Sequence, residues 1–222
     1  MDGTEEHGML VHPWDASLDD AEWQRWIAAG HDFGLLVVNG TPGRPPHTVP
    51  THFASEGRRL LVHLARPNPV WAAIERDPDV ALTVIGDYAF VPGPWRAPAG
   101  TPPAEGVPTS YYTAVRFTCR ARIVDDPQDK ADLLRRQLAH FQPDGDHAAV
   151  AADRPPYGRM LSGIRGLRLD VTDVQAKFKY DDHKPVEHRT AVAGHLTARD
   201  QGLDAPAARQ QLRRLDRIGR WT

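Results

Sequence analysis

The sequence contains a single cysteine, Cys119, among its 222 residues. One cysteine excludes an internal disulfide and any zinc site built from several cysteines, and it favours a cytoplasmic location as the default. The chain also lacks any apolar run near the roughly 18 residues that a membrane-spanning helix needs, so we expect no membrane insertion. Residues 1–12 are acidic and polar, which does not fit a secretory signal.

An excess of positive charge is missing as well. The 27 Lys and Arg residues stand against 29 Asp and Glu residues, and this balance gives no argument for general nucleic-acid affinity. The sequence holds no glycine-rich phosphate loop, no His-Glu-x-x-His zinc pair and no nucleophile elbow. Its histidine pairs 47/52 and 183/188 do not share a face, so a metal site could form only from residues distant in sequence.

Turn residues are abundant, with 20 prolines and 18 glycines, which favours β architecture over a helical bundle. Apolar runs and alternation predict strands over residues 34–38, 48–53, 60–65, 80–85, 88–91, 111–124 and 164–180. Helices are expected near residues 17–27, after Pro127 and beyond Lys184. Strands and helices do not alternate regularly, so we predict a mainly β (α+β) fold, an antiparallel barrel with peripheral helices. A barrel of this kind often pairs across a two-fold axis.

Three local patterns predict more specific features. The helix after Pro127 is capped by Asp125-Asp126, and its buried stripe is expected at Ala131, Leu134, Leu138 and Phe141. The segment 96–107 is rich in Pro and Gly and is predicted to be a loop near a site or a partner. The C-terminal arginines are interpreted as a solvated helix face: Arg213, Arg214 and Arg217.

The stretch 60–74 is a strand that leads directly into a short helix. Asn68 suits an N-cap, and Pro69 suits the first helical position. His63, Arg66 and free helix N–H groups would gather at this strand end, where a phosphate or another anion could bind. A surface turn without a ligand explains the same residues equally well.

Three further groups are candidate ligand contacts. Thr51 and His52 lie beside this strand and could reach a shared ligand, or could form a satisfied polar pair. The segment 109–112 offers hydroxyl groups and aromatic faces suited to phosphate contacts and ring stacking, although such residues also favour ordinary strands. Lys177 and Lys179 place two cations on one strand face, which is also typical of solvated lysines.

Taken together, three motifs resemble the PaiB-type "FMN-binding negative transcriptional regulator" family: residues 63–71 (HLARPNPVW), 107–112 (VPTSYY) and 176–179 (AKFK). The resemblance covers residues 9–189. It implies a split β-barrel of the FMN-binding, pyridoxamine-phosphate-oxidase type over residues 1–190, with residues 191–222 as a helical extension. It also implies a homodimer with FMN at the subunit seam. The residues that would line this cofactor site are His63, Arg66, Asn68, Thr109, Tyr111 and Tyr112, with Lys177 and Lys179 neutralising an anionic group.

The chain departs from the family pattern at Ser110-Tyr111, which replaces a Trp-Asn pair. Some relatives use haem b in place of flavin, among them piperazate synthase, which joins two nitrogens, and proteins that degrade haem. In a haem protein His63 would be the axial ligand. Three hypotheses therefore stand: a flavin-dependent oxidoreductase or redox-linked regulator, a haem enzyme, and a DNA-binding transcriptional regulator.

Overall fold

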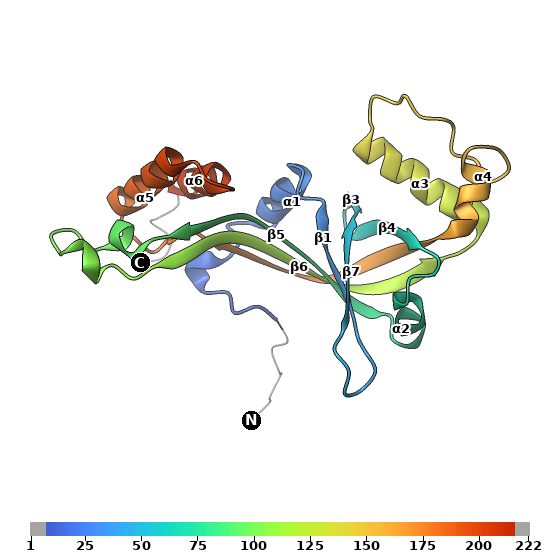
Figure 1. Ribbon diagram of the computed structural model, residues 1–222, viewed down its shortest axis with the longest axis horizontal. Coiled ribbons are helices and arrows are strands. Elements are labelled where there is room, and N and C mark those ends of the chain that lie inside the picture. Colours follow the sequence, from blue (N-terminus) through green and yellow to red (C-terminus); the bar gives the residue numbers. More distant parts are fainter. Residues whose placement is uncertain (1–7, 216–222) are drawn as a thin grey trace. The chain divides into compact units, whose positions relative to one another are not determined.

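The computed structural model describes residues 8–215, which form two compact units (Figure 1). Unit 1 contains residues 8–26, 85–115 and 175–215, and unit 2 contains residues 27–84 and 116–174. Three long strands contribute residues to both units. Each unit is described separately below.

Seven strands form one sheet in the order β2-β1-β5-β6-β7-β4-β3. Their bounds are β1 Phe33–Val38, β2 His47–His52, β3 Ala54–Glu56, β4 Arg59–Ala65, β5 Asp79–Val91, β6 Thr109–Val124 and β7 Ile164–Lys179. Strand β1 pairs antiparallel with β2 and β5, and β4 pairs antiparallel with β3 and β7. This arrangement confirms the predicted antiparallel, mainly β fold with helices around it.

Strand β5 corrects one prediction. The two short strands expected at 80–85 and 88–91 are a single strand of 13 residues. Asp87 has a φ of 51°, a left-handed conformation that Asp tolerates better than most residues. Its carboxylate accepts hydrogen bonds from Trp26 Nε1 at 2.7 Å and Gln210 Nε2 at 2.9 Å, which fix this residue within unit 1. The irregular residue therefore distorts the strand without ending it.

In unit 2 the strands enclose a core of fully buried aliphatic and aromatic side chains. The alternation predicted for β6 is confirmed, because Phe117, Cys119 and Ala121 are all buried. The end of β2 lies beside β4, where the His52 and His63 rings are 5.2 Å apart. Because β2 is at one edge of the sheet and β4 is next to the other edge, this approach closes the sheet around the core.

Three helices belong to unit 2: α2 Val70–Arg76, α3 Pro127–Phe141 and α4 Tyr157–Met160. Helix α2 begins one residue later than predicted, yet Asn68 Oδ1 still accepts a hydrogen bond from the Val70 N–H at 3.1 Å. Asp126 caps α3 as predicted, because its side chain accepts from two first-turn N–H groups at 2.8 and 3.1 Å.

The predicted buried stripe of α3 is only partly correct. Ala131 is buried, but Phe141 at the end of the stripe is 41% exposed. The fully buried positions include Leu133 and Gln137, and α3 packs on β3 and β4. The helix is therefore rotated about its axis relative to the prediction, and part of its apolar stripe is left open to a cavity described below.

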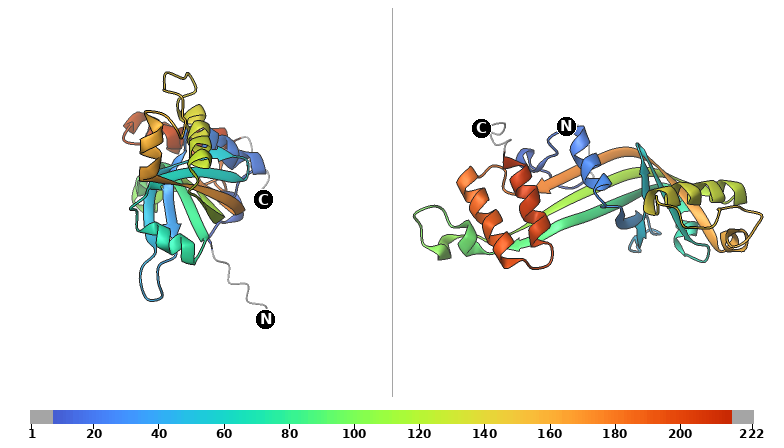
Figure 2. Two further views of the ribbon diagram at one scale, coloured as in Figure 1. Left: turned by 90° about the vertical axis from the view of Figure 1, so that its right-hand side faces the viewer. Right: turned by 90° about the horizontal axis from the view of Figure 1, so that it is seen from above.

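Unit 1 contains most of α1 Asp20–Ala28, together with α5 Val186–Arg199 and α6 Asp204–Arg213, which lie side by side (Figure 2). It also contains the 3₁₀ helices η1 Pro13–Asp15, η2 Gly93–Arg96 and η3 Pro103–Glu105. Residues 96–107 hold only the end of η2 and the short η3, which confirms the irregular loop predicted there. Helix α5 begins at Val186, a few residues before the helical extension predicted from residue 191.

The solvated arginine face predicted at the C-terminus is wrong for Arg214, which is fully buried. Its guanidinium group lies 2.7 Å from Glu22 and 2.6 Å from Asp182, and both of these carboxylates are also buried. Arg213 is partly exposed and pairs with Glu22 at 2.6 Å. Arg217 lies outside the described residues. The C-terminal arginines thus tie α6 to α1 through ion pairs.

Candidate functional site

The residues predicted to contact a cofactor fall into two groups, one in each unit. Unit 2 holds Thr51, His52, His63, Arg66 and Asn68, while unit 1 holds Thr109, Tyr111, Tyr112, Lys177 and Lys179. The fold brings residues together within each group, and the geometry of each group differs.

His52 and His63 meet across the closure of the sheet in unit 2. Their rings lie edge to face, with centroids 5.2 Å apart, and Phe141 contacts the His52 ring at 5.0 Å. Thr51 does not join them, because it is buried and its hydroxyl donates to the His52 carbonyl. Two imidazoles from β2 and β4 therefore form one wall, with α3 supplying an aromatic ring.

Gln137 on α3 fixes the orientation of the His63 ring. The Gln137 amide nitrogen donates to the Leu61 carbonyl at 2.9 Å, so its Oε1 must face His63, where it lies 2.7 Å from Nδ1. An amide oxygen only accepts hydrogen bonds, so His63 Nδ1 carries a proton, and in the neutral ring the lone pair lies on Nε2. Buried Gln137 thus fixes the ring so that Nε2, not Nδ1, is the nitrogen available to a ligand.

A cavity of about 420 Å³ opens in front of this histidine pair. Its walls are the two imidazoles, Gln137 and the apolar side chains of Leu134, Leu138 and Phe141. This volume lies within the usual range for small-molecule sites, roughly 300 to 1,000 Å³. The cavity is therefore large enough for part of a planar cofactor, and it is mainly apolar.

Burial lowers the pKa of His52 below its ordinary value, and the neighbouring His63 lowers it further, while Asp32 opposes them. Asp32 is itself engaged by His140 at 2.8 Å. A lowered pKa favours the neutral form of the His52 imidazole near neutral pH. His52 can then act as a hydrogen-bond acceptor beside His63.

Arg66 and Asn68 lie further along the chain from His63, at the end of β4, and do not line this cavity. Arg66 pairs with Asp125 at 2.7 Å, and that hydrogen bond lowers the pKa of the Asp125 carboxyl group. The same carboxylate lies 3.2 Å from Arg165 and 3.9 Å from Lys130. Three cations therefore surround Asp125.

In unit 1, Lys179 Nζ donates to Thr109 Oγ1 at 2.9 Å, and both Lys177 Nζ and Lys179 Nζ lie 5.8 Å from the centre of the Tyr112 ring. The fold thus brings two predicted lysines to the Tyr112 ring, with Thr109 bonded to one of them. Tyr111 points elsewhere: it is fully buried, and burial raises the pKa of its phenol. Its hydroxyl donates to Asp181 and accepts from Gln211, both at 3.0 Å.

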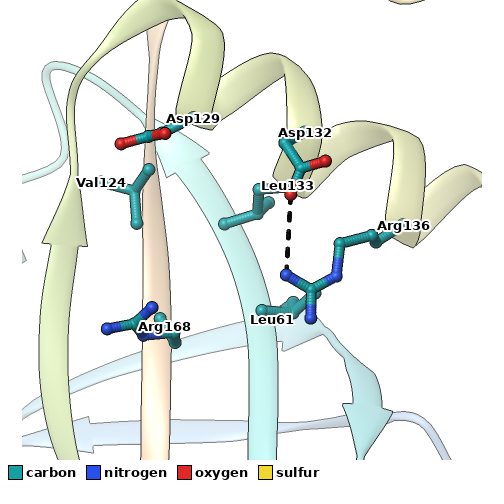
Figure 3. A pocket seen from close by; sticks show the side chains of 7 residues that line it. All are labelled: Leu61, Val124, Asp129, Asp132, Leu133, Arg136 and Arg168. Atoms are coloured by element: carbon teal, nitrogen blue, oxygen red, sulfur yellow. Dashed lines mark ion pairs between the residues drawn. The ribbon is translucent and has the colours of Figure 1, made fainter.

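A second, smaller pocket lies on another side of α3 (Figure 3). It measures about 160 Å³ and is rich in charge, with Asp132 and Arg136 3.7 Å apart and Arg168 on the opposite wall. Arg136 is also paired with Glu56 on β3. The pocket is too small for a cofactor.

Sequence reasoning did not find Gln137 or the role of Phe141. Phe141 carried a signal, because it belongs to the apolar stripe of α3, but that stripe predicted burial and not a cavity wall. Gln137 carried none, since nothing local distinguishes a buried glutamine from an exposed one.

Residues 9–173 match a family model described as "Putative FMN-binding domain". The chain belongs to this family. It is 26% identical over 159 residues to the protease synthase and sporulation protein PAI 2 of Bacillus subtilis, a match that covers 69% of this chain and 73% of the relative. The protein is accordingly an FMN-binding split-barrel protein that resembles PaiB, with FMN as its cofactor.

Two solved structures support the same fold. The flavocytochrome Anf3 of Azotobacter vinelandii has a TM-score of 0.57 and 21% identity, with 75% of this chain and 70% of that chain covered. The FAD and heme binding protein of Mycobacterium smegmatis has a TM-score of 0.56 and 14% identity, with 74% and 73% covered. The split β-barrel expected from the sequence is therefore confirmed.

Within residues 8–215, no three His, Cys, Asp or Glu side chains are placed to hold a metal ion. No helix in that part of the chain is long and apolar enough to cross a membrane.

Proposed function

We propose that the protein is a flavin-dependent oxidoreductase whose FMN lies against the His52–His63 wall of unit 2. The observation that carries this proposal is the Gln137–His63 hydrogen bond, which engages Nδ1 and leaves Nε2 as the free ring nitrogen beside a mainly apolar cavity of about 420 Å³. An apolar cavity with a few oriented polar groups is the usual form of a cofactor site. Leu134, Leu138 and Phe141 suit the apolar faces of an aromatic ring system.

The charge at the end of β4 fits the phosphate of FMN. Arg66, Arg165 and Lys130 share Asp125, and Glu75 adds one more carboxylate through its 2.8 Å contact with Arg165. These contacts join three cations at the end of β4, with Asp126 as a further carboxylate near Lys130. Burial and the nearby Arg66 lower the pKa of Lys130, as expected where positive charge accumulates. In this proposal Arg66 and Asn68 hold the phosphate end.

Bound FMN would supply the transfer of one or two electrons. The residues of the chain have different tasks. His63 accepts a hydrogen bond at Nε2, Gln137 holds its tautomer, and His52 offers a second neutral imidazole. Phe141 and the leucines of α3 limit the access of water. In unit 1, Lys179 offers a further cation beside Tyr112, whereas Lys177 is buried and donates to the Leu10 carbonyl at 2.7 Å.

The first test measures FMN binding to the purified protein, with flavin fluorescence and the visible absorption spectrum as readouts. Arg66→Met should weaken FMN binding about tenfold or more and reduce its salt dependence, because a charge-assisted contact is lost. Arg159→Met is the matched control, since Arg159 is an exposed arginine of unit 2 on α4. Unchanged FMN affinity in Arg66→Met would remove the assigned phosphate contact.

A second candidate function is haem binding, and one observation favours it. Histidines that ligate metals almost always donate their other ring N–H to an oxygen acceptor, as His63 does to Gln137. His63 Nε2 would then be the axial ligand of haem b, in an enzyme for N–N bond formation or haem degradation. Titration with hemin should give a Soret band that shifts in His63→Ala. A band that is identical in that variant would eliminate this candidate.

The proposal also includes a homodimer, a cytoplasmic location and, as a third candidate, DNA-linked regulation. Phe33 and Leu35 on β1 are 63% and 39% exposed, and this apolar strip of unit 2 supports burial against a second copy.

Arg213 and Arg214 offer little to DNA, because Glu22 and Asp182 already pair with them. Light scattering tests the dimer, and a salt-dependent gel shift tests DNA binding.

A further inference from the structure

The proline-rich loop of residues 92–107 in unit 1 forms one wall of a second large cavity. This cavity measures about 650 Å³, and helix α5 forms its other wall. The family model matches residues 9–173, and helix α5 lies beyond that range. The sequence predicted a loop near a site or a partner here, and the proposed FMN site of unit 2 does not use it.

The loop is held in a fixed position. Arg96 forms a two-pronged ion pair with Asp181 at 2.9 and 3.2 Å and also donates to the Val107 carbonyl. Gly93 and Gly106 approach so closely that a Cβ on Gly106 would overlap the Gly93 carbonyl. The cavity wall is therefore preformed, which lowers the entropic cost of binding.

Trp95 provides an oriented aromatic edge on this wall. Its ring stacks on His195 with centroids 4.9 Å apart, and the Arg199 guanidinium lies 4.8 Å from its centre. The remaining apolar lining comes from small and cyclic side chains, namely Ala97, Pro98, Ala99, Pro185 and Ala191. Most of the cavity thus suits an apolar body.

Two polar groups in the lining have no hydrogen-bond partner within residues 8–215. The Lys184 side chain forms no hydrogen bond or ion pair with these residues. His188 Nε2 is buried without a hydrogen-bond partner there, and its nearest carboxylate oxygen, on Asp181, is 3.9 Å away. A buried polar atom without a partner is costly, and a ligand atom would satisfy it.

The sign and number of ligand charges follow from the lining. Asp181 already neutralises Arg96, which leaves the Lys184 ammonium group to attract an anion. Glu187 is the acidic side chain of the lining, and it is exposed at α5, where it would repel a second negative charge. A singly charged carboxylate therefore fits better than a phosphate dianion.

We propose that this cavity binds a small monocarboxylate with an aromatic or aliphatic body. Lys184 contacts the carboxylate, His188 Nε2 completes its hydrogen bonding, and the apolar body packs against Trp95 and the prolines. This site is separate from the FMN site proposed for unit 2, and it does not depend on that proposal.

The test compares three probes of one shape: phenylacetate, phenylacetamide and phenethylamine. Each is titrated into the full-length FMN-loaded protein by calorimetry and by saturation-transfer NMR. We expect phenylacetate to bind about tenfold or more tightly than the neutral amide, and the amine to bind most weakly. Lys184→Met should remove this preference. Arg209→Met, which removes an exposed charge from α6 outside the cavity, should retain it.

Two filling variants test the location. Ala191→Trp from α5 and Ala99→Trp from the loop should each abolish phenylacetate binding, and thermal melting verifies that each remains folded. The proposal is overturned by equal affinity for the three probes, or by unchanged binding in a folded filling variant. It is also overturned if phenylacetate displaces FMN, because the cavity would then belong to the cofactor site.

Discussion

Gln137 and His63 are 74 residues apart in the chain, yet Gln137 Oε1 lies 2.7 Å from His63 Nδ1. The second contact of the same amide, to the Leu61 carbonyl, leaves only one way to read the pair: His63 donates and Gln137 accepts. A helix residue thus decides which nitrogen of a strand histidine faces the cavity. This relationship underlies both cofactor hypotheses, because flavin contact and haem ligation each need a defined Nε2.

Replacing Gln137 with Leu should release the His63 tautomer. Nitrogen-15 NMR should then show a mixture of Nδ1–H and Nε2–H forms in place of one form, and cofactor affinity should fall about 10- to 100-fold. Leaving the Leu61 carbonyl unpaired should also cost about 1–3 kcal/mol of unfolding free energy. Gln128→Leu, at an exposed position of the same helix, is the control. A single unchanged tautomer in Gln137→Leu would contradict the assignment.

Because the pKa of His52 is lowered in the folded protein, the free energy of unfolding should decrease at acidic pH. The unfolded chain protonates this imidazole near its ordinary pKa of 6.5, whereas the folded protein resists until lower pH. Stability is therefore complete above about pH 6.5 and is lost as the pH falls toward the folded pKa. Urea unfolding across this range should show a smaller loss in His52→Gln than in the native chain.

The cause of this shift can be checked separately by NMR titration of His52. Burial is the main cause of the lowered pKa and should persist in His63→Ala. That variant removes the second cause, the neighbouring His63 imidazole, so the pKa of His52 should rise partway toward its ordinary value. A pKa of His52 at or above its ordinary value in the native protein would show that the histidine pair is not buried as described.

Arg214→Met should destabilise the protein strongly. The variant leaves Glu22, which is 1% exposed, and Asp182, which is 2% exposed, without their shared cation. Breaking a buried ion pair costs about 3–5 kcal/mol. Arg213→Met removes a partly exposed partner of Glu22 and should cost no more than about 1 kcal/mol. Denaturant unfolding measures both, and similar losses would mean that Arg214 is solvated.

Two glycine variants should change the stability of the fold in opposite directions. Gly106→Ala forces a methyl group against the Gly93 carbonyl, and the backbone shift should cost about 1–3 kcal/mol. Gly194→Ala adds a methyl group in open space on α5 and should stabilise that helix by about 0.5–1 kcal/mol. Melting temperatures give the signs. A neutral Gly106→Ala would show that the loop is not tightly held.

Local patterns predicted the elements well. The alternation from Tyr111 to Ala121, the Asp126 cap and the strand carrying His63 depend on neighbours in the chain, and all three are found in the structure. The motifs at residues 63–71, 107–112 and 176–179, taken together, also led to the correct family. Asn68 was assigned to a helix start and is found there, because capping needs only nearby backbone groups.

The long-range pairings were decided only by tertiary structure. Whether α3 buries Leu138 or Gln137 depends on a rotation of the helix that its own periodicity does not fix, and the burial of Arg214 depends on two carboxylates far away in the sequence. Asp87 bends β5 without ending it because Trp26 and Gln210 fix its carboxylate. The sequence by itself thus determined the strands, the caps and the family. Packing determined which side chains meet, because the energy of a buried polar contact depends on partners that no local pattern records.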